Sequence, residues 1–186
     1  MVHSEIYSLN HSGAGEDYET ARLDFQHALF VRLTKGNLLP EHIFRNLPPN
    51  ARIADVGTGT GIWLNELSKQ LPFAQLEGFD MAPENFGIVA SNVKLHEYSQ
   101  NALEAFQYEL QGKFDVVHVR LLMFGLKSNE WAKAFANLAT LLKPGGWVCW
   151  EDTGYISWVT IPPSRAWYDL LNFDIEFARM VGRDIT

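Results

Sequence analysis

Apolar positions in the middle of the chain come in short runs that alternate with longer amphipathic segments. The runs predict buried strands, and they cover residues 52–56, 75–80, 92–96, 113–119 and 147–151. Apolar spacings of three and four residues predict helices between them, over 62–71, 101–111 and 129–142. Strands that alternate with helices predict an α/β fold, with a doubly wound, mostly parallel sheet and helices on both faces.

Helical patterns also flank this alternating region. We expect a long helix over residues 18–35, a short one over 40–46, and at least one more over 162–180. Residues 1–15 have no periodic pattern and are expected to be irregular. The apolar stripe expected on the long helix comprises Ala21, Phe25, Ala28 and Leu29.

Length and composition narrow the class of protein. The 186 residues suffice for one domain with a sizeable core, and the net charge of −7 argues against nucleic acid as a partner. The single cysteine, Cys149, excludes an internal disulfide, and the histidines lack paired spacing, so no metal site is expected. We find neither a signal peptide nor an apolar run that could span a bilayer, so we expect a cytoplasmic or nuclear protein without a membrane partner.

Three glycines follow the first predicted strand at alternate positions, Gly57, Gly59 and Gly61. In an open parallel sheet, ligands bind beyond the carboxyl ends of the strands, and glycine lets a backbone approach a ligand closely. Asp80 is the last residue of the second predicted strand, where an acid is placed to accept hydrogen bonds from ribose hydroxyls. The combination favours a nucleoside ligand, and the alternative is a tight turn without one.

The spacing of the glycines distinguishes between nucleoside ligands. In the dinucleotide fingerprint G-x-G-x-x-G the third glycine comes one position later than Gly61 does here. Asp55, two residues before Gly57, would repel a pyrophosphate. Both features argue against a dinucleotide.

The motifs resemble those of class I methyltransferases that use S-adenosylmethionine. Residues 54–61 (ADVGTGTG) resemble the first motif, 114–118 the fourth, and 141–147 (LLKPGGW) the turn before the fifth strand. Residues 22–27 (RLDFQH), 115–120 (DVVHVR) and LLKPGGW are similar to those of fungal methyltransferases of secondary metabolism. The resemblance implies a Rossmann-like core that binds S-adenosylmethionine and releases S-adenosylhomocysteine.

The resemblance also implies roles for single residues. Asp80 would bind the ribose, Met81 would pack on adenine, and His118 is the candidate general base, with a hydrogen-bonded core histidine as the alternative. Glu151 and Asp152, at the end of the fifth strand, would orient a substrate or belong to a solvated loop. The expected cofactor-binding residues are Tyr18, Asp55, Gly57, Thr58, Gly59, Gly61, Asp80, Met81, Ser99, Gln100 and Arg120.

Two features depart from the family's pattern. Ser99 and Gln100 stand where relatives often have an acid that binds the adenine amino group. The family fold adds two strands after the fifth, and no such pattern follows here, so we expect a fragment or shortened product. An open sheet edge would favour a homo- or hetero-oligomer. The expected parts are a helical lid (1–50), a cofactor-binding core (51–160) and the start of a substrate-covering insertion (161–186).

The leading hypothesis for function is methyl transfer to an oxygen or nitrogen of a small, natural-product-like acceptor. The reaction is a direct displacement, in which the protein mainly aligns the two groups and excludes water. One alternative is a catalytically silent, methyltransferase-like subunit that regulates or binds a partner. Another is a methyltransferase fold reused for a reaction without methyl transfer.

Overall fold

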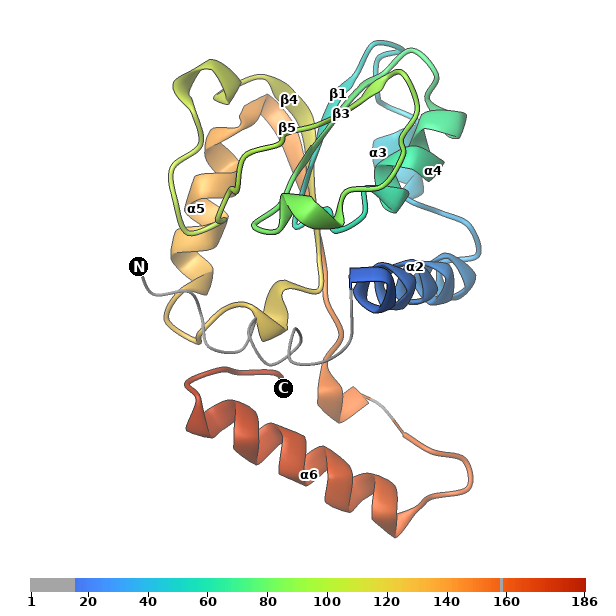
Figure 1. The fold of residues 1–186 in the computed structure, drawn as a ribbon, viewed down its shortest axis with the longest axis vertical. Helices are drawn as coiled ribbons and strands as arrows, with labels where there is room; N and C mark the ends of the chain where they lie inside the picture. The colour runs from blue at the N-terminus through green and yellow to red at the C-terminus, as the bar shows by residue number, and fades with distance from the viewer. Residues whose placement is uncertain (1–15, 158) are drawn as a thin grey trace.

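A parallel sheet of five strands, in the order β3-β2-β1-β4-β5, forms the centre of the protein (Figure 1). The computed structural model describes residues 16–157 and 159–186, so the expectations for residues 1–15 lie outside it. The expected doubly wound α/β fold is confirmed. The strands are β1 (Arg52–Val56), β2 (Gln75–Phe79), β3 (Val93–Leu95), β4 (Phe114–Arg120) and β5 (Leu142–Glu151).

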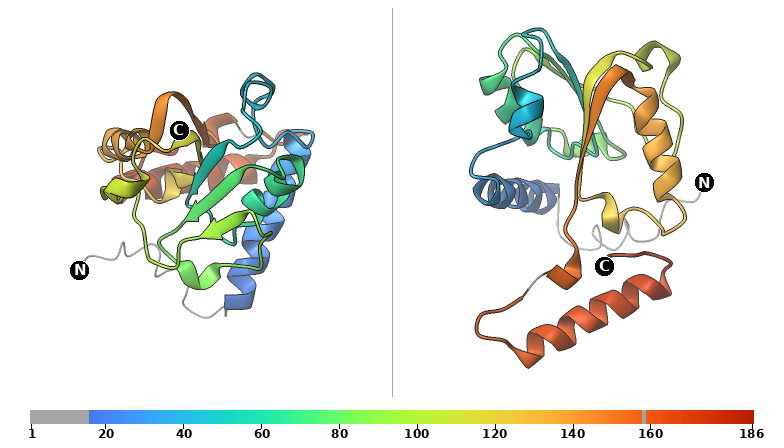
Figure 2. Two further views of the ribbon diagram at one scale, coloured as in Figure 1. Left: turned by 90° about the horizontal axis from the view of Figure 1, so that it is seen from above. Right: turned by 180° about the vertical axis from the view of Figure 1, so that it is seen from behind.

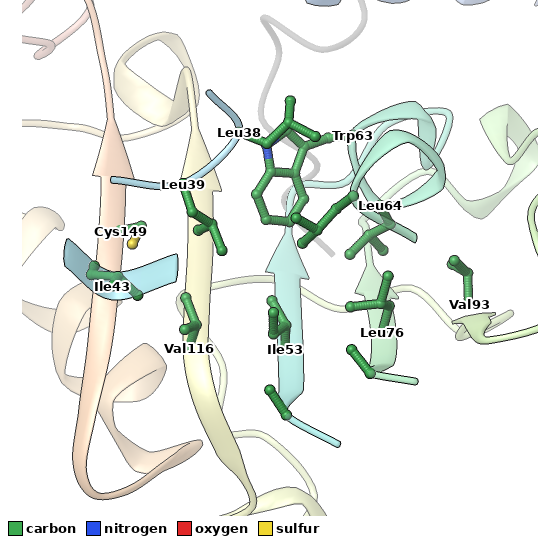
Figure 3. Close-up of a cluster of buried hydrophobic side chains, with 13 residues drawn as sticks. Leu38, Leu39, Ile43, Ile53, Trp63, Leu64, Leu76, Val93, Val116 and Cys149 are labelled. Carbon is green, nitrogen blue, oxygen red and sulfur yellow. The ribbon is translucent and has the colours of Figure 1, made fainter. Parts of the chain in front are cut away.

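Helices cover both faces of the sheet because its central strands are apolar on both sides. Ile53 and Val116 belong to the core under α4, whereas Ala54 and Val117 belong to the core under α5. Figure 3 shows the core under α4. In it, the side chain of Trp63 lies nearer to the carboxyl end of β1 than the side chain of Ile53 does. The helices are α2 (Glu16–Leu33), α3 (Glu41–Phe44), α4 (Ile62–Gln70), α5 (Trp131–Thr140) and α6 (Arg165–Met180).

Strand β1 lies between β2 and β4, so the direction of strand order reverses beside it. Such a switch point is where open parallel sheets bind ligands, beyond the carboxyl ends of the strands. The loops after β1, β2 and β4 all leave the sheet at this edge. Helix α6 lies beyond the same edge, away from α4 and α5, which cover the two opposite faces of the sheet (Figure 1 and Figure 2). No helix in the described ranges is long and apolar enough to cross a membrane.

The expected helix over residues 101–111 is wrong. This segment forms turns and one short 3₁₀ helix at Tyr108–Leu110. The side chain of Asn101 accepts a hydrogen bond from the backbone N–H of Leu103, which stabilises a turn and competes with a helix. Phe106 and Leu110 are buried in the core under α5, so the apolar spacing reflects a loop anchored at two points.

The apolar stripe expected on α2 is also wrong, although the helix itself is confirmed. Phe25 is 76% exposed, and Leu29 lies on the same outer face. The face toward the sheet carries His27, which is buried, and Leu23. Because α2 has apolar residues on both faces, periodicity alone does not identify the buried one.

Helix α5 is shorter than expected, and β5 begins earlier. The helix ends at Thr140, and the Pro144–Gly146 turn lies inside the ten-residue strand β5. Leu142 pairs with Phe114 and Trp147 pairs with Val116, so the extra residues form a bulge. On α5, Leu138 is buried as expected, but Phe135 is exposed.

Candidate functional site

The glycine loop connects β1 to α4 with a backbone that only glycine adopts readily. Gly57, Gly59 and Gly61 have φ angles of +76°, +58° and +80°, in the left-handed region. A Cβ on Gly59 would lie 3.2 Å from the side chain of Leu23, and one on Gly57 would lie 3.2 Å from Leu122. The loop is therefore closely covered by α2 and by the segment after β4.

Asp80 lies directly against this loop. Its Oδ2 accepts a 2.7 Å hydrogen bond from the backbone N–H of Gly59, and its Oδ1 accepts one of 2.9 Å from Ala82. The side chain is buried, and this burial raises the pKa of Asp80 to about 6, although the backbone hydrogen bonds oppose the shift. The sequence-based placement of an acid at the end of β2, beside the glycine loop, agrees with this geometry.

Asp55 joins the glycine loop to β4. Its Oδ2 accepts a 2.7 Å hydrogen bond from the Thr58 hydroxyl, and its Oδ1 lies 2.7 Å from Nδ1 of His118. Asp55 and His118 are directly opposite each other in the register of β1 and β4. Asp55, held by His118, therefore fixes the start of the glycine loop through the hydroxyl of Thr58.

His118 is 1% exposed and lies flat against the indole of Trp63. Burial alone would lower its pKa, but Asp55 and Glu151 outweigh burial, so the pKa of His118 is raised. Oε2 of Glu151 lies 3.6 Å from the second ring nitrogen of His118. A buried imidazole whose pKa is raised between two carboxylates suits positioning better than the removal of a proton from a substrate.

Arg120 ties the end of β4 to helix α2. Its Nη2 donates to Nδ1 of His27 over 2.9 Å, and its guanidinium carbon lies 5.1 Å from the ring centre of Phe30. Because a guanidinium only donates, the proton of the His27 ring is on Nε2, which faces Glu66 at 3.1 Å. Burial lowers the pKa of His27, in agreement with a neutral ring.

Three residues of this site were given no role from the sequence. Trp63 and Glu66 come from α4, one turn apart, and contact His118 and His27. Asp24, on α2, accepts a 2.8 Å hydrogen bond from the hydroxyl of Thr60. The spacing of residues 63 and 66 on one helix face is the only sequence signal that could have indicated their contacts.

Three other expected cofactor residues make no described side-chain contact with the glycine loop. Gln100 donates its backbone N–H to the Asp80 carbonyl, but its side-chain amide bonds the Asn101 carbonyl. The Ser99 hydroxyl donates to the carbonyl of Met81. Tyr18 is 63% exposed, in the first turns of α2. These side chains are therefore not aimed at the loop by any described contact.

A second feature of this edge is a hollow of about 390 Å³ beyond the ends of β4 and β5. It is lined by Met123, Ser128, Trp131, Asp152, Thr153, Gly154, Asp184, Ile185 and Thr186.

Comparison with known proteins places the chain in a family. The profile of a methyltransferase domain matches residues 25–174. The methyltransferase grgD of a Penicillium species is 40% identical over 156 residues, which are 80% of this chain and 54% of the relative. The N-methyltransferase gliN of Aspergillus fumigatus is 33% identical over 170 residues, 89% of this chain and 56% of the relative.

A solved structure confirms the fold. The plantazolicin methyltransferase BpumL, in complex with SAH, has a TM-score of 0.59 at 20% identity, covering 78% of this chain and 56% of its own. This chain spans about half the length of the curated relatives that it matches. The resemblance to fungal methyltransferases of secondary metabolism is confirmed. The chain belongs to the methyltransferase domain family.

Proposed function

We propose that this chain binds S-adenosylmethionine and transfers its methyl group to a nitrogen or oxygen of a small-molecule acceptor. The observation that carries the proposal is the contact between Asp80 and Gly59 at the switch point of the sheet. It places a buried carboxylate, suited to ribose hydroxyls, beside a backbone with little room for a Cβ.

The residues present fit this cofactor. Asp80 would hold the ribose, Met81 would contact adenine, and the glycine loop would face the amino acid part. Arg120, fixed by His27, would pair with the carboxylate of that part. The indole Nε1 of Trp63 is buried and has no hydrogen-bond partner within the described residues, so it offers a further donor at this end of β1.

Each part of the site then has a chemical task. The cofactor supplies a methyl group that is already activated by its sulfonium, so the protein must align the acceptor and exclude water. His118 acts as a positioning residue: it holds Asp55, which holds Thr58 of the loop. Helix α2 covers the loop through Leu23 and the Asp24–Thr60 hydrogen bond, which limits the access of water.

The names of relatives favour nitrogen as the accepting atom. Three of them, tcpN, sirN and gliN, are named N-methyltransferases. On this basis we propose that the methyl group is transferred to a nitrogen atom of the acceptor.

Calorimetric titration with S-adenosylhomocysteine tests the cofactor site. We expect a dissociation constant of about 1–10 μM for the wild-type chain, weakened at least about tenfold in Asp80→Ala. Asp169→Asn, which removes one exposed carboxylate on α6, is the matched control and should bind as the wild type does. Equal affinity in Asp80→Ala, or no binding by a folded wild-type chain, would contradict the proposal.

A further inference from the structure

The hollow beyond β4 and β5 has the position of a second ligand site. The glycine loop and Asp80 follow β1 and β2, whereas this hollow is bordered by residues that follow β4 and β5. Both features lie at the carboxyl edge of one sheet, which is where proteins with open parallel sheets bind their ligands. The volume of about 390 Å³ falls within the range of small-molecule sites.

Asp152 supplies the carboxylate that is fixed in this hollow. Its Oδ2 accepts a 2.7 Å hydrogen bond from the indole N–H of Trp150. Its Oδ1 accepts a longer hydrogen bond of 3.4 Å from the backbone N–H of Met123, and the backbone of Leu122 also donates to this carboxylate. Because the two oxygens of a carboxylate together offer about four acceptor sites, Asp152 can accept another donor. The side chain is half-buried, and this burial raises the pKa of Asp152.

Aromatic surface stands beside this carboxylate. Trp131 lines the hollow and stacks on Trp150, with ring centres 5.2 Å apart and an angle of 23° between the planes. Met123 adds a buried, polarizable wall. An indole face and a carboxylate together recognise a cation that carries an apolar body.

The charge of the lining has one sign. None of the nine described residues around the hollow is Lys, Arg or His, and Asp184 adds a second carboxylate. Arg179 and Arg183 line a neighbouring hollow of about 240 Å³, which shares Ser128, Asp184 and Thr186 with this one. Arg179 acts on Asp184, so Asp152 is the carboxylate of this lining that no lining cation offsets. An anionic occupant would therefore meet a half-buried carboxylate here without a compensating cation from the described lining.

We propose that this hollow is the acceptor site, that the acceptor enters it as an ammonium ion with an aromatic or apolar body, and that Asp152 holds the nitrogen. The inference rests on the proposed function and names its substrate class. An ammonium nitrogen has no free electron pair, so it must lose a proton before it can accept a methyl group. One N–H bond breaks, the proton passes to Oδ1 of Asp152, and nitrogen keeps the electron pair.

A matched pair of probes tests the charge requirement. Tryptamine and tryptophol share the indole ring and the two-carbon chain and differ in an ammonium against a hydroxyl group. We expect tryptamine to bind the wild-type chain with a dissociation constant of about 1 mM or below, at least about tenfold tighter than tryptophol. Indole-3-propionate, the anionic counterpart, should bind most weakly. The titrations are calorimetric and need no cofactor.

A substitution then assigns the discrimination to one residue. Asp152→Asn keeps an oxygen that can accept from Trp150, so the fold should be retained, and the preference for tryptamine should fall to about twofold or less. Asp169→Asn is the control for the same change of charge outside the hollow.

Three results would overturn the inference: equal binding of tryptamine and tryptophol, a preference for indole-3-propionate, or an unchanged preference in Asp152→Asn. The comparison of probes on the wild-type chain decides the charge requirement even where the variant fails to fold. Binding of S-adenosylhomocysteine without discrimination between tryptamine and tryptophol would overturn this inference alone, and the proposed function would stand.

Discussion

The imidazole of His118 lies parallel to the indole of Trp63, with ring centres 3.8 Å apart and an angle of 3° between the planes. One ring comes from β4 and the other from the first turn of α4, directly after the glycine loop. Because His118 also contacts Asp55, the stack connects three elements that border the loop. Because the pKa of His118 is raised, its protonated form is favoured, and this form adds a cation–π attraction over the indole face.

Replacing His118 should therefore destabilise the fold. In His118→Gln the buried carboxylate of Asp55 loses its cationic partner, and we expect the free energy of unfolding to fall by about 3 kcal/mol. The pKa of His118 is raised in the folded state, so its stabilising effect is complete below the unfolded value of about 6.5. The effect is lost as the pH rises through the folded value. Urea unfolding at several pH values should show a cost that shrinks on the alkaline side.

His42→Gln is the control for this pH series. His42 is exposed and packs edge-on against Trp147, so we expect its replacement to change the free energy of unfolding by no more than about 0.5 kcal/mol. A cost for His118→Gln that stays constant across the neutral and alkaline range would show that the imidazole is not charged in the folded protein.

Alanine at Gly59 should damage both stability and cofactor binding. The φ angle of +58° is unfavourable for alanine, and the new Cβ would press on Leu23 at 3.2 Å. We expect a loss of about 1–2 kcal/mol in the free energy of unfolding and at least about tenfold weaker binding of S-adenosylhomocysteine. Urea unfolding and calorimetry measure the two effects separately.

Gly112 offers a matched control because it shares the strain but not the location. Its φ angle is +67°, and a Cβ there would meet nothing within 4 Å. Gly112→Ala should cost about 1 kcal/mol of stability and leave binding unchanged. If both variants lost binding equally, general destabilisation would explain the loss, and a role of Gly59 in the site would be contradicted.

The strands and the glycine loop could be predicted from the sequence because local patterns determine them. The bounds of β1 are those expected, since a short apolar run ends directly at Gly57. The Asp55–His118 pair could not be predicted, because it depends on the register of two strands that are 63 residues apart. His118 looked like an isolated strand histidine, and only its neighbours show that it is held between carboxylates.

Helix α2 shows the converse limit. Its existence follows from its periodicity, but the stripe with Phe25 looked more apolar than the face with Asp24 and His27. The second face is turned inward because Thr60 and Arg120 offer partners for its polar groups. Burial here follows from hydrogen bonding across elements, which a count of apolar positions does not include.

The Asp24–Thr60 hydrogen bond should couple α2 energetically to the glycine loop. We expect a double-mutant cycle with Asp24→Ala and Thr60→Val to give an interaction energy of about 1 kcal/mol in urea unfolding. Each single variant should also weaken the binding of S-adenosylhomocysteine, because the loop loses its contact with α2. The exposed Arg165–Asp169 pair on α6 provides a control cycle, with an expected interaction energy below about 0.5 kcal/mol. Additive effects of Asp24→Ala and Thr60→Val would show that the hydrogen bond does not connect the two elements.

Asp80 should make cofactor binding depend on pH. Its pKa in the unliganded protein is raised to about 6, and only the ionised carboxylate accepts hydrogen bonds from both ribose hydroxyls. The affinity for S-adenosylhomocysteine should be nearly constant above the pKa and fall by up to about tenfold per pH unit below it.

Asp80→Asn cannot titrate at this position, so its weaker affinity should have a flatter profile over the same pH range. His27 and His118 are retained in this variant, and any slope that they cause appears in both profiles and cancels in the comparison. Calorimetric titrations of the two proteins at matched pH values measure the difference, and parallel profiles would show that Asp80 does not hold the ligand as a carboxylate.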